Sequence, residues 1–344
     1  MRGVICLSIV DEFSVEVNNR ICETGTGEIL QDVSESGKVR NWDEKKKTNL
    51  QMVNLYQKAM LKDESVMSFS RLMQMKDCAN YLVFSDDGGK KKLVDANFCR
   101  VRLCPVCNWR KSLKMFSQVS EITDVLLKEK PWVRFIFLTL TLKNPTAEEL
   151  KGSLDKMNEG FKWLVQKSKT FAPAKILKEN LLGYLKSTEI TFNSRQNTYH
   201  PHFHVLLELK SNYFATGYIK QSEYVQMWKQ ALKLDYNPQV DVRIIRNASS
   251  RVIAEMSKYP TKTADLLKLK NENQAVDALI TLHNAMRNRR LVTFGGDFKE
   301  IRRRLKLDDI ETGSLVHTET KNEGLNNVAY TLFKYNANYG CYIC

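Results

Sequence analysis

Segments in which apolar and polar residues alternate, and runs of β-branched and aromatic residues, predict the strands of this chain. The clearest strand spans residues 132–142, and a second candidate spans residues 199–209. Residues 182–192 predict a strand that the turn at 193–198 joins to the second candidate as a hairpin. Further strands are predicted at 240–245 and 291–294, and the turn at 86–89 predicts another hairpin.

Apolar residues spaced three and four positions apart predict helices between these strands. The predicted helices span residues 43–75, 112–130, 146–167, 222–234 and 271–288. From residue 132 onward the order is β-α-β-β-α-β, which is typical of a ferredoxin-like antiparallel sheet with helices on one face. We therefore expect an α+β fold.

The pattern divides the chain into five parts. We expect a loose arm, then a helical module that contains a cysteine cluster, then the sheet domain, then a basic extension of that domain, and finally a peripheral tail. The corresponding residues are 1–42, 43–130, 131–268, 269–310 and 311–344.

The chain has 344 residues and a net charge of +14, which favours a polyanionic partner and nucleic acid before a membrane surface. It has no apolar run long enough to span a bilayer. The apolar run at 4–10 is followed by Asp11 and Glu12 rather than by a small-residue cleavage site. We therefore expect a cytoplasmic protein without a signal peptide.

Eight cysteines in a reducing compartment point to metal binding where they cluster. Cys104 and Cys107 form a CxxC knuckle, and Cys99 and Cys78 complete a predicted structural zinc site in a zinc-ribbon-like module. A CxxC redox pair is the alternative. No role is assigned to the remaining cysteines, Cys6, Cys22, Cys341 and Cys344.

Basic residues surround this knuckle in the sequence. We therefore expect the module to contact DNA as well. The residues concerned are Arg100, Arg102, Arg110 and Lys111.

Three of the five histidines lie within five residues, at 200, 202 and 204. In a strand, His202 and His204 lie side by side on one face, where two imidazoles can bind one divalent ion. Across the predicted hairpin, Glu189 can supply a carboxylate ligand. The register His200 with His202 is disfavoured because Pro201 would take the middle position and cannot donate to the ladder. A pair of hydrogen-bonded structural histidines is the alternative.

A helix is expected to begin near Ser249 or Ser250 and to end at Tyr259, because Pro260 follows. Glu255 would then share a helix face with Tyr259. Taken alone, such a pair is an ordinary surface pair.

Four features now stand in one order: the cysteine cluster, the strand 137–141, the His202-Phe203-His204 motif, and Tyr259-Pro260-Thr261-Lys262. Together they closely resemble the rolling-circle replication initiators of small bacterial plasmids, within the HUH endonuclease superfamily. The position of Glu255 resembles the branch typified by the pUB110 and pC194 plasmids. The resemblance covers about residues 40–310.

The resemblance implies a nickase that cuts the plasmid origin. His202 and His204, with Glu189, would bind Mn²⁺ or Mg²⁺, and Tyr259 would be the nucleophile that forms a 5′-phosphotyrosyl intermediate and frees a 3′-OH primer. Glu255 would assist termination, and Lys262 matches a motif lysine. The implied partners are origin DNA, both as duplex and as single-stranded hairpin, and the host helicase and DNA polymerase. No membrane partner is expected, and a homodimer is left open.

Different functions stay open on the sequence alone. A relaxase or a single-tyrosine transposase would share the histidine motif. A non-enzymatic zinc-ribbon DNA-binding protein and an unrelated metallohydrolase also fit the composition and the cysteine and histidine motifs. A metal-dependent nick that leaves protein covalently on DNA distinguishes a tyrosine nickase from these last two classes.

Overall fold

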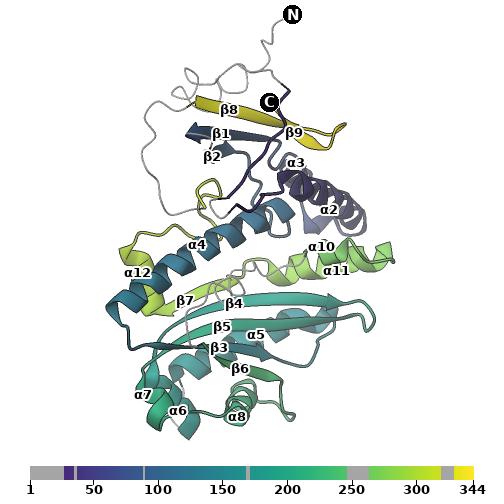
Figure 1. Ribbon diagram of the computed structural model, residues 1–344. Helices are drawn as coiled ribbons and strands as arrows, with labels where there is room; N and C mark the ends of the chain where they lie inside the picture. The colour runs from purple at the N-terminus through teal and green to yellow at the C-terminus, as the bar shows by residue number, and fades with distance from the viewer. Residues whose placement is uncertain (1–26, 35–36, 88–89, 168–170, 246–262, 319–328) are drawn as a thin grey trace, which may run out of the picture.

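The computed structural model describes residues 27–34, 37–87, 90–167, 171–245, 263–318 and 329–344. It confirms an α+β fold, with two antiparallel sheets and flanking helices (Figure 1). The larger sheet has five strands in the order β6-β3-β5-β4-β7, and the smaller has four in the order β2-β1-β8-β9. Each described helix is too short or too polar to cross a bilayer.

The larger sheet is built from the strands that the sequence pattern predicts, with boundaries within two residues of the expected ones. β5 lies between β3 and β4 and pairs with both in antiparallel register. The strands are β3 (Arg134–Thr141), β4 (Leu181–Asn193), β5 (Thr198–Leu209), β6 (Val240–Ile245) and β7 (Val292–Gly296).

Helices cover one face of this sheet. Phe203 and Val205 of β5 are fully buried against Met157 and Trp228 on that face, which anchors the strand. The elements around this core are α5 (Ala147–Lys162), the π-helical turn η2 (Trp163–Lys167), α6 (Ala172–Asn180), α7 (Asn212–Thr216) and α8 (Gln221–Leu232). The sequence did not indicate α6 and α7.

The opposite face of the sheet packs against α4 (Pro105–Glu129) and α12 (Asp297–Arg304). Phe137 and Leu206 are buried there with Val119 of α4 and Phe298 of α12. In Figure 1, α4, α12 and α11 (Glu272–Met286) lie between the two sheets. This face also carries His202 and His204, because they share the parity of Leu206.

The predicted helix 43–75 is divided into α2 (Trp42–Lys62), the 3₁₀ turn η1 (Glu64–Val66) and α3 (Phe69–Lys76). The break follows from Asp63, whose backbone is extended and whose carboxylate accepts from the Ser65 N–H at 3.0 Å. A short helix α10 (Thr263–Leu266) precedes α11.

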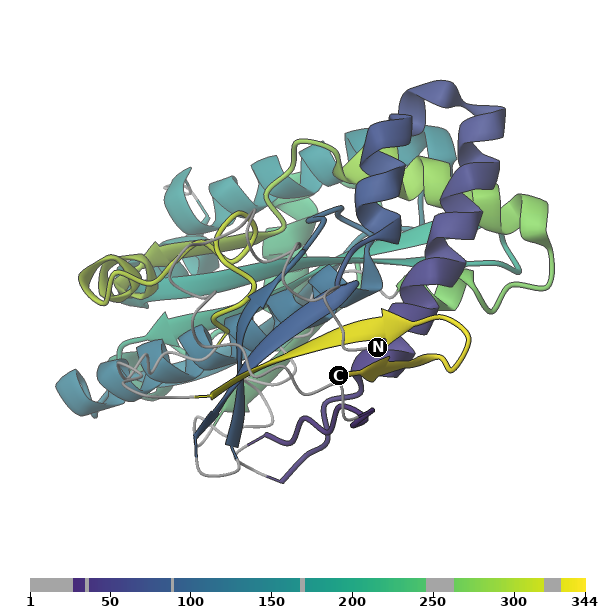
Figure 2. The ribbon, with the colours of Figure 1, turned by 90° about the horizontal axis from the view of Figure 1, so that it is seen from above.

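The tail is more integrated than the sequence suggested. The predicted hairpin around 86–89 forms as β1 (Tyr81–Asp87) and β2 (Lys90–Ala96), and β8 (Ala329–Asn336) pairs with β1. β8 and β9 (Cys341–Ile343), drawn in yellow in Figure 2, complete the smaller sheet beside β1. Phe333 and Tyr342 are fully buried, so these tail residues belong to a core rather than to the periphery.

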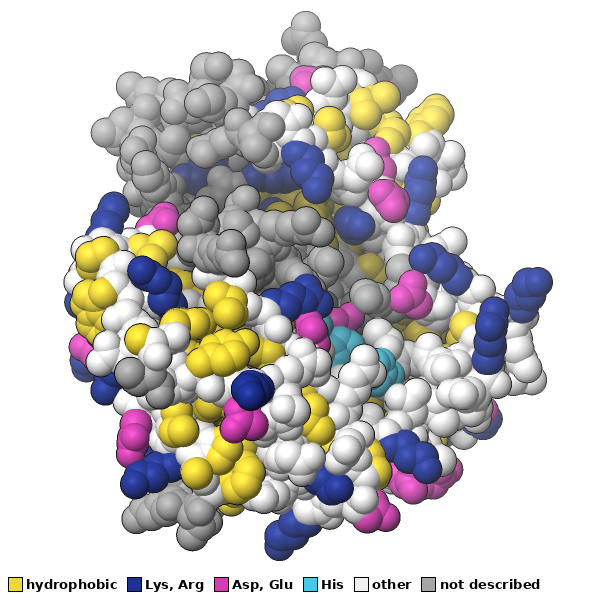
Figure 3. Space-filling model, turned by 60° about the horizontal axis from the view of Figure 1, so that its bottom comes forward, with side chains coloured by type: hydrophobic (Ala, Val, Ile, Leu, Met, Phe, Trp, Pro, Cys, Tyr) yellow, Lys and Arg dark blue, Asp and Glu magenta, His cyan; other side chains and the backbone are white. Residues whose placement is uncertain are grey.

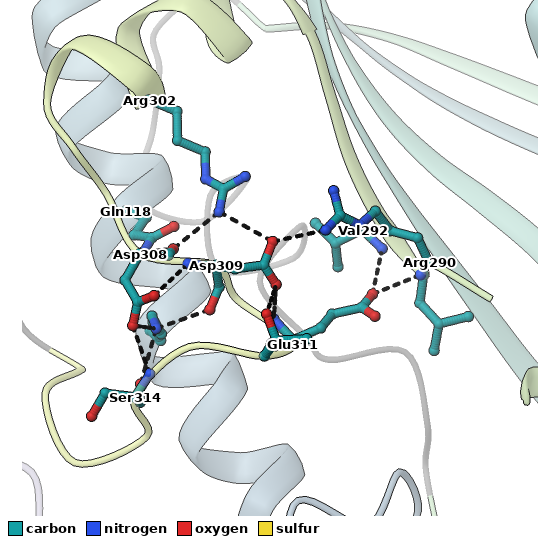
Figure 4. Close-up of polar contacts among 11 residues, drawn as sticks. Gln118, Arg290, Val292, Arg302, Asp308, Asp309, Glu311 and Ser314 are labelled. Carbon is teal, nitrogen blue, oxygen red and sulfur yellow. Dashed lines mark hydrogen bonds and ion pairs between the residues drawn. The ribbon is translucent and has the colours of Figure 1, made fainter. Parts of the chain in front are cut away.

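The segment that follows α12 makes polar contacts with both α4 and β7 (Figure 4). Lys114 of α4 is 3% exposed, and its Nζ donates to Asp308 Oδ2 at 2.7 Å and to the Ser314 carbonyl at 2.9 Å. Glu311 Oε1 accepts from the backbone N–H of Leu291 and Val292 at 2.7 and 3.1 Å. The segment therefore ties α4 to β7 through the buried Lys114 ammonium and the Glu311 carboxylate.

One buried carboxyl lies on the α4 side of the sheet. Glu208 of β5 is fully buried and lies opposite Gly183 of β4, where a Cβ would approach Glu208 Oε2 to 2.7 Å. Burial, and then the nearby charge of Asp297, raise the pKa of Glu208 to about 8, while Lys130 acts to lower it. Glycine at 183 therefore makes room for a carboxyl whose burial favours the protonated form.

Replacing Glu208 with glutamine should increase stability above pH 4.5. Because the folded state holds a proton that the unfolded state loses, the wild-type contribution is fully present below about pH 4.5 and is lost as pH rises through about 8. The gain of Glu208→Gln should grow across this interval and exceed about 1 kcal/mol at pH 8. Thermal unfolding between pH 4.5 and 9 measures it. The exposed Glu179→Gln should show no such trend, and parallel curves for wild type and Glu208→Gln would contradict the assignment.

Candidate functional site

The hairpin of β4 and β5 brings a carboxylate and two imidazoles together. Glu189 lies directly opposite His202 in the ladder, and His204 is the next residue on the same face. The Nε2 atoms of His202 and His204 lie 2.9 and 3.0 Å from Glu189 Oε2. The two rings are nearly perpendicular, with centroids 4.6 Å apart. The structure therefore places these three predicted residues in one group.

The orientation of both rings is supported by neighbouring groups. Nδ1 of His202 donates to the His200 carbonyl at 3.3 Å. In the neutral tautomer this directs the Nε2 lone pair at the Glu189 carboxylate, so the two groups need a shared cation or a proton between them. His204 stacks on Phe137 at 5.5 Å between centroids, and its Nδ1 lies 3.5 Å from Thr139 Oγ1.

His200 lies beside this group. Its ring centroid is 5.1 Å from that of His202, while Pro201 between them pairs with Ile190 in the ladder. Burial, and then the charge of His202, lower the pKa of His200. One ligand atom each from Glu189, His202 and His204 lies within 4.8 Å of the others, and His200 is not part of this group.

This donor set fits a divalent cation. Two imidazole nitrogens and a carboxylate oxygen provide three ligand atoms, and the side chain of His204 is 17% exposed. Figure 3 shows histidine side chains at a hollow in the surface, with acidic and basic side chains beside them. A bound ion would therefore be accessible to a ligand from outside.

Four cysteines form a second group inside the smaller half of the molecule. Cys78 follows α3, Cys99 follows β2, Cys104 caps α4, and Cys107 lies in the first turn of α4. All four are at most 6% exposed. Three Sγ–Sγ distances are 3.6, 3.7 and 3.6 Å, for Cys78–Cys107, Cys99–Cys107 and Cys78–Cys104.

These distances exclude disulfides, whose sulfur atoms are about 2.05 Å apart. They match the edge of about 3.8 Å that follows from tetrahedral Zn–S bonds of about 2.3 Å. Burial raises the pKa of Cys78 and Cys104. Burial also opposes ionisation of Cys107, but hydrogen bonds from the other cysteines and from the Arg100 N–H lower its pKa. The four sulfur atoms therefore suit one metal ion.

Groups from α2 also contact this cluster, and sequence reasoning missed them. Lys46 is fully buried, and its Nζ donates to the carbonyls of Lys76 and Cys78 at 2.7 and 2.8 Å. The Cys104 thiol donates to Asn49 Oδ1 at 3.1 Å. No local spacing could reveal these contacts, because Lys46 and Asn49 lie about 30 residues before Cys78.

The basic residues expected to contact DNA lie in different environments. Arg110 and Lys111 are 2% and 3% exposed, and Arg110 donates to the carbonyls of Leu315 and Val316. Burial of both side chains in α4 argues against the predicted DNA contact for these two residues. Arg102 pairs with Glu311 at 3.6 Å, and Arg100 is exposed and donates to the Thr312 carbonyl.

The remaining predicted site residues, Glu255, Tyr259 and Lys262, lie outside the described residues. The described chain ends at Ile245, the last residue of β6, and resumes at Thr263, the first residue of α10. Their placement beside the histidines therefore stays a prediction.

Comparisons with known proteins show clear relatives. A family model described as "Replication protein" matches residues 90–343. A "Protein rep" of Streptococcus pneumoniae is 37% identical over 305 residues, which cover 87% of this chain and 90% of that protein. A "Protein rep" of Bacillus amyloliquefaciens is 36% identical over 327 residues, covering 89% and 94%. A "Protein rep" of Lactiplantibacillus plantarum is 38% identical over 300 residues, covering 84% and 90%. No solved structure matches.

The four-cysteine geometry predicts about one tightly bound metal ion per chain, which Cys104→Ser or Cys107→Ser should release. Because ligand binding adds to the free energy of unfolding, both variants should also unfold at lower temperature or become insoluble. Elemental analysis and thermal unfolding measure these effects. Cys341→Ser, which alters a cysteine outside the cluster, is the control. Metal content and stability that do not change in either cluster variant would contradict the prediction.

Proposed function

Since this chain belongs to the replication-protein family and is a plasmid replication initiator of the pC194/pUB110 type, we propose that it nicks the plasmid origin through a tyrosine. The observation that carries this proposal is the convergence of Glu189, His202 and His204 on one face of the larger sheet. The family match over residues 90–343 favours an initiator over a relaxase, a transposase or a non-enzymatic zinc-ribbon protein.

The fold supports a ferredoxin-like HUH domain. Counted from β3, the first four strands lie in the order fourth, first, third, second, and all neighbouring pairs are antiparallel. We assign residues 131–268 to this domain, with the basic extension 269–310 supplying β7 to its edge. Residues 43–130, joined by β8 and β9 of the tail, form the zinc-ribbon-like module. In the predicted loose arm 1–42, Ile29 forms a β-bridge with Ile343 of β9 and the buried Trp42 begins α2, so the described part of this segment packs against the module.

The three converging residues would hold Mn²⁺ or Mg²⁺. When bound, the ion supplies Lewis-acid polarisation of the non-bridging phosphate oxygens. Glu189 then contributes a negative ligand, and the histidines contribute neutral nitrogens held by the strand register. Phe203 and Val205, buried on the opposite face, keep β5 from shifting as DNA binds.

Tyr259 is the proposed nucleophile. Its phenol loses its proton and the phenolic oxygen forms a bond to phosphorus while the bond from phosphorus to the 3′ oxygen breaks. The leaving oxygen takes up a proton to become a 3′-OH. Host DNA polymerase would extend that hydroxyl, with host helicase opening the duplex ahead of it. Lys262, near Tyr259 in the sequence, is assigned to the same site.

The four cysteines would hold Zn²⁺ as a structural ion. The sulfur spacing and the complete burial of Cys104 and Cys107 support a closed site without a position for substrate. Among the neighbouring basic residues, the exposed Arg100 is the one that we retain as a contact to duplex origin DNA.

The first test is Tyr259→Phe, which should abolish nicking and the covalent protein–DNA adduct. Origin binding should stay close to wild type, because only the nucleophilic oxygen is removed. Incubation with labelled origin single strands and Mn²⁺, followed by denaturing electrophoresis, detects the adduct. A wild-type amount of adduct from Tyr259→Phe would disprove the assignment.

The histidine motif gives a second test. His202→Ala and His204→Ala should each reduce cleavage at least about 100-fold, because even partners outside the ligand shell cost about 10–100-fold. His200→Ala should retain most activity and is the matched control from the same strand. Equal loss in His200→Ala and His204→Ala would show that the assumed ligand pair is wrong.

Glu255 is tested through termination. If its carboxylate activates a water that releases the enzyme, Glu255→Ala should still nick and form adduct but should not close single-unit circles. If Glu255 forms only a surface ion pair, worth about 0.3–0.5 kcal/mol, initiation and termination should stay normal or fall together. Analysis of replication products in cells distinguishes these outcomes, and normal circles refute the catalytic role.

A further inference from the structure

The edge strand β6 carries a charged pair on the face of the sheet that holds the candidate metal site. Asp241 lies opposite Thr139, and Thr139 in turn lies opposite His204. Arg243, two residues further along β6, lies opposite Phe137. Because side chains two residues apart share a face, Asp241 and Arg243 extend the row of site residues toward the sheet edge.

The position of Arg243 is fixed from two sides. Its Nε donates to Asp241 Oδ2 at 2.6 Å, and its Cζ lies 5.6 Å from the ring centroid of Phe137. Phe137 is 2% exposed and stacks on His204 at 5.5 Å. The guanidinium therefore lies within about 11 Å of the His204 ring.

The chemistry of this position suits a phosphate. A guanidinium is a planar fork of donors that matches phosphate oxygens, and its cation–π contact with the Phe137 ring favours this position of the side chain. Asp241 bonds to Nε, which orients the fork before a ligand arrives. The side chain of Arg243 is 58% exposed, so a DNA strand bound along this face of the sheet can reach it.

An ordinary surface ion pair is the simpler interpretation of Arg243 and Asp241, and such pairs add little stability. The location of this pair favours a contact with DNA instead. Arg243 rests on the ring that supports His204, and β6 directly precedes the segment 246–262, which contains Tyr259. This spacing is short enough for one strand to contact both the metal site and Arg243 through neighbouring phosphates.

We propose that Arg243 binds a DNA phosphate one or two nucleotides from the scissile phosphate and so positions the single strand at the Glu189–His202–His204 site. This inference rests on the proposed nicking function. Arg243 acts as a positioning residue, because its guanidinium holds a flanking phosphate and does not touch the reacting atoms.

The test measures how tightly the full-length Tyr259→Phe protein binds overlapping single-stranded oligonucleotides. Together these cover the origin of the plasmid that encodes the protein. Each phosphate is replaced in turn by a neutral methylphosphonate. With Arg243 present, one replacement near the nick should weaken binding about tenfold, as expected for a lost charge-assisted hydrogen bond. With Arg243→Gln, the same replacement should change affinity no more than about twofold, and Arg243→Lys should lie between them.

Arg134→Gln is the matched control, since Arg134 is also exposed but alternates onto the opposite face of neighbouring β3. It should keep the full sensitivity to that replacement. In proteins with intact Tyr259, Arg243→Gln should raise KM about tenfold with little change in kcat, because the chemical groups are untouched. Thermal unfolding should match wild type.

Two results would overturn the inference. One is equal sensitivity to the same methylphosphonate with arginine or glutamine at position 243, and the other is the absence of any sensitive phosphate near the nick. Because binding is read without cleavage, the test also separates the two proposals. If the protein with intact Tyr259 forms no adduct while the Tyr259→Phe protein still shows the Arg243-dependent phosphate, the nicking mechanism is refuted and the phosphate subsite is supported.

Discussion

The antiparallel pairing of β5 between β3 and β4 is the constraint on which the candidate site depends. Side chains alternate along a strand, so a slip of one residue would turn His202 and His204 toward α5 and α8 and would move Phe203 and Val205 out of the core on that face. Both apolar side chains are fully buried, and exposing each one costs about 1.5–3 kcal/mol. The hydrophobic core on one face therefore holds the metal-binding groups in register on the other.

Buried cations fix the backbone at other points of the molecule. Lys46 donates to carbonyls at the end of α3 and at Cys78, and Lys114 and Arg110 donate to carbonyls of the segment after α12. An ammonium or guanidinium buried without such partners would cost several kcal/mol, so each contact selects one loop conformation. Part of the positive charge of this chain thus serves the fold, and charge counted from the sequence overstates what is available to DNA.

The sequence was informative where a local rule governs the structure. Strand parity placed His202, His204 and Glu189 together because the side-chain period of a strand is fixed. The CxxC spacing, with Cys99 and Cys78, identified the cysteine cluster for a similar reason. Contacts between distant segments could not be predicted from the sequence, because no local pattern encodes them. The pairing of β8 with β1 and the contact of Lys46 with Cys78 are two examples. The break at Asp63 was missed because a capping side chain there competes with an otherwise continuous helical pattern.

Helix α4 joins the two candidate metal groups mechanically. It begins at the cysteines, with Cys104 as its cap and Cys107 in its first turn, and runs 25 residues, about 37 Å. Further along, Val119 packs against the face formed by Phe137 and Leu206, next to His204. A close-packed interior transmits displacements, so the position in which the cysteine cluster holds the start of α4 also determines how α4 lies on the site-bearing face. The four cysteines that hold the start of α4 therefore also help to position this helix against the face that carries His202 and His204.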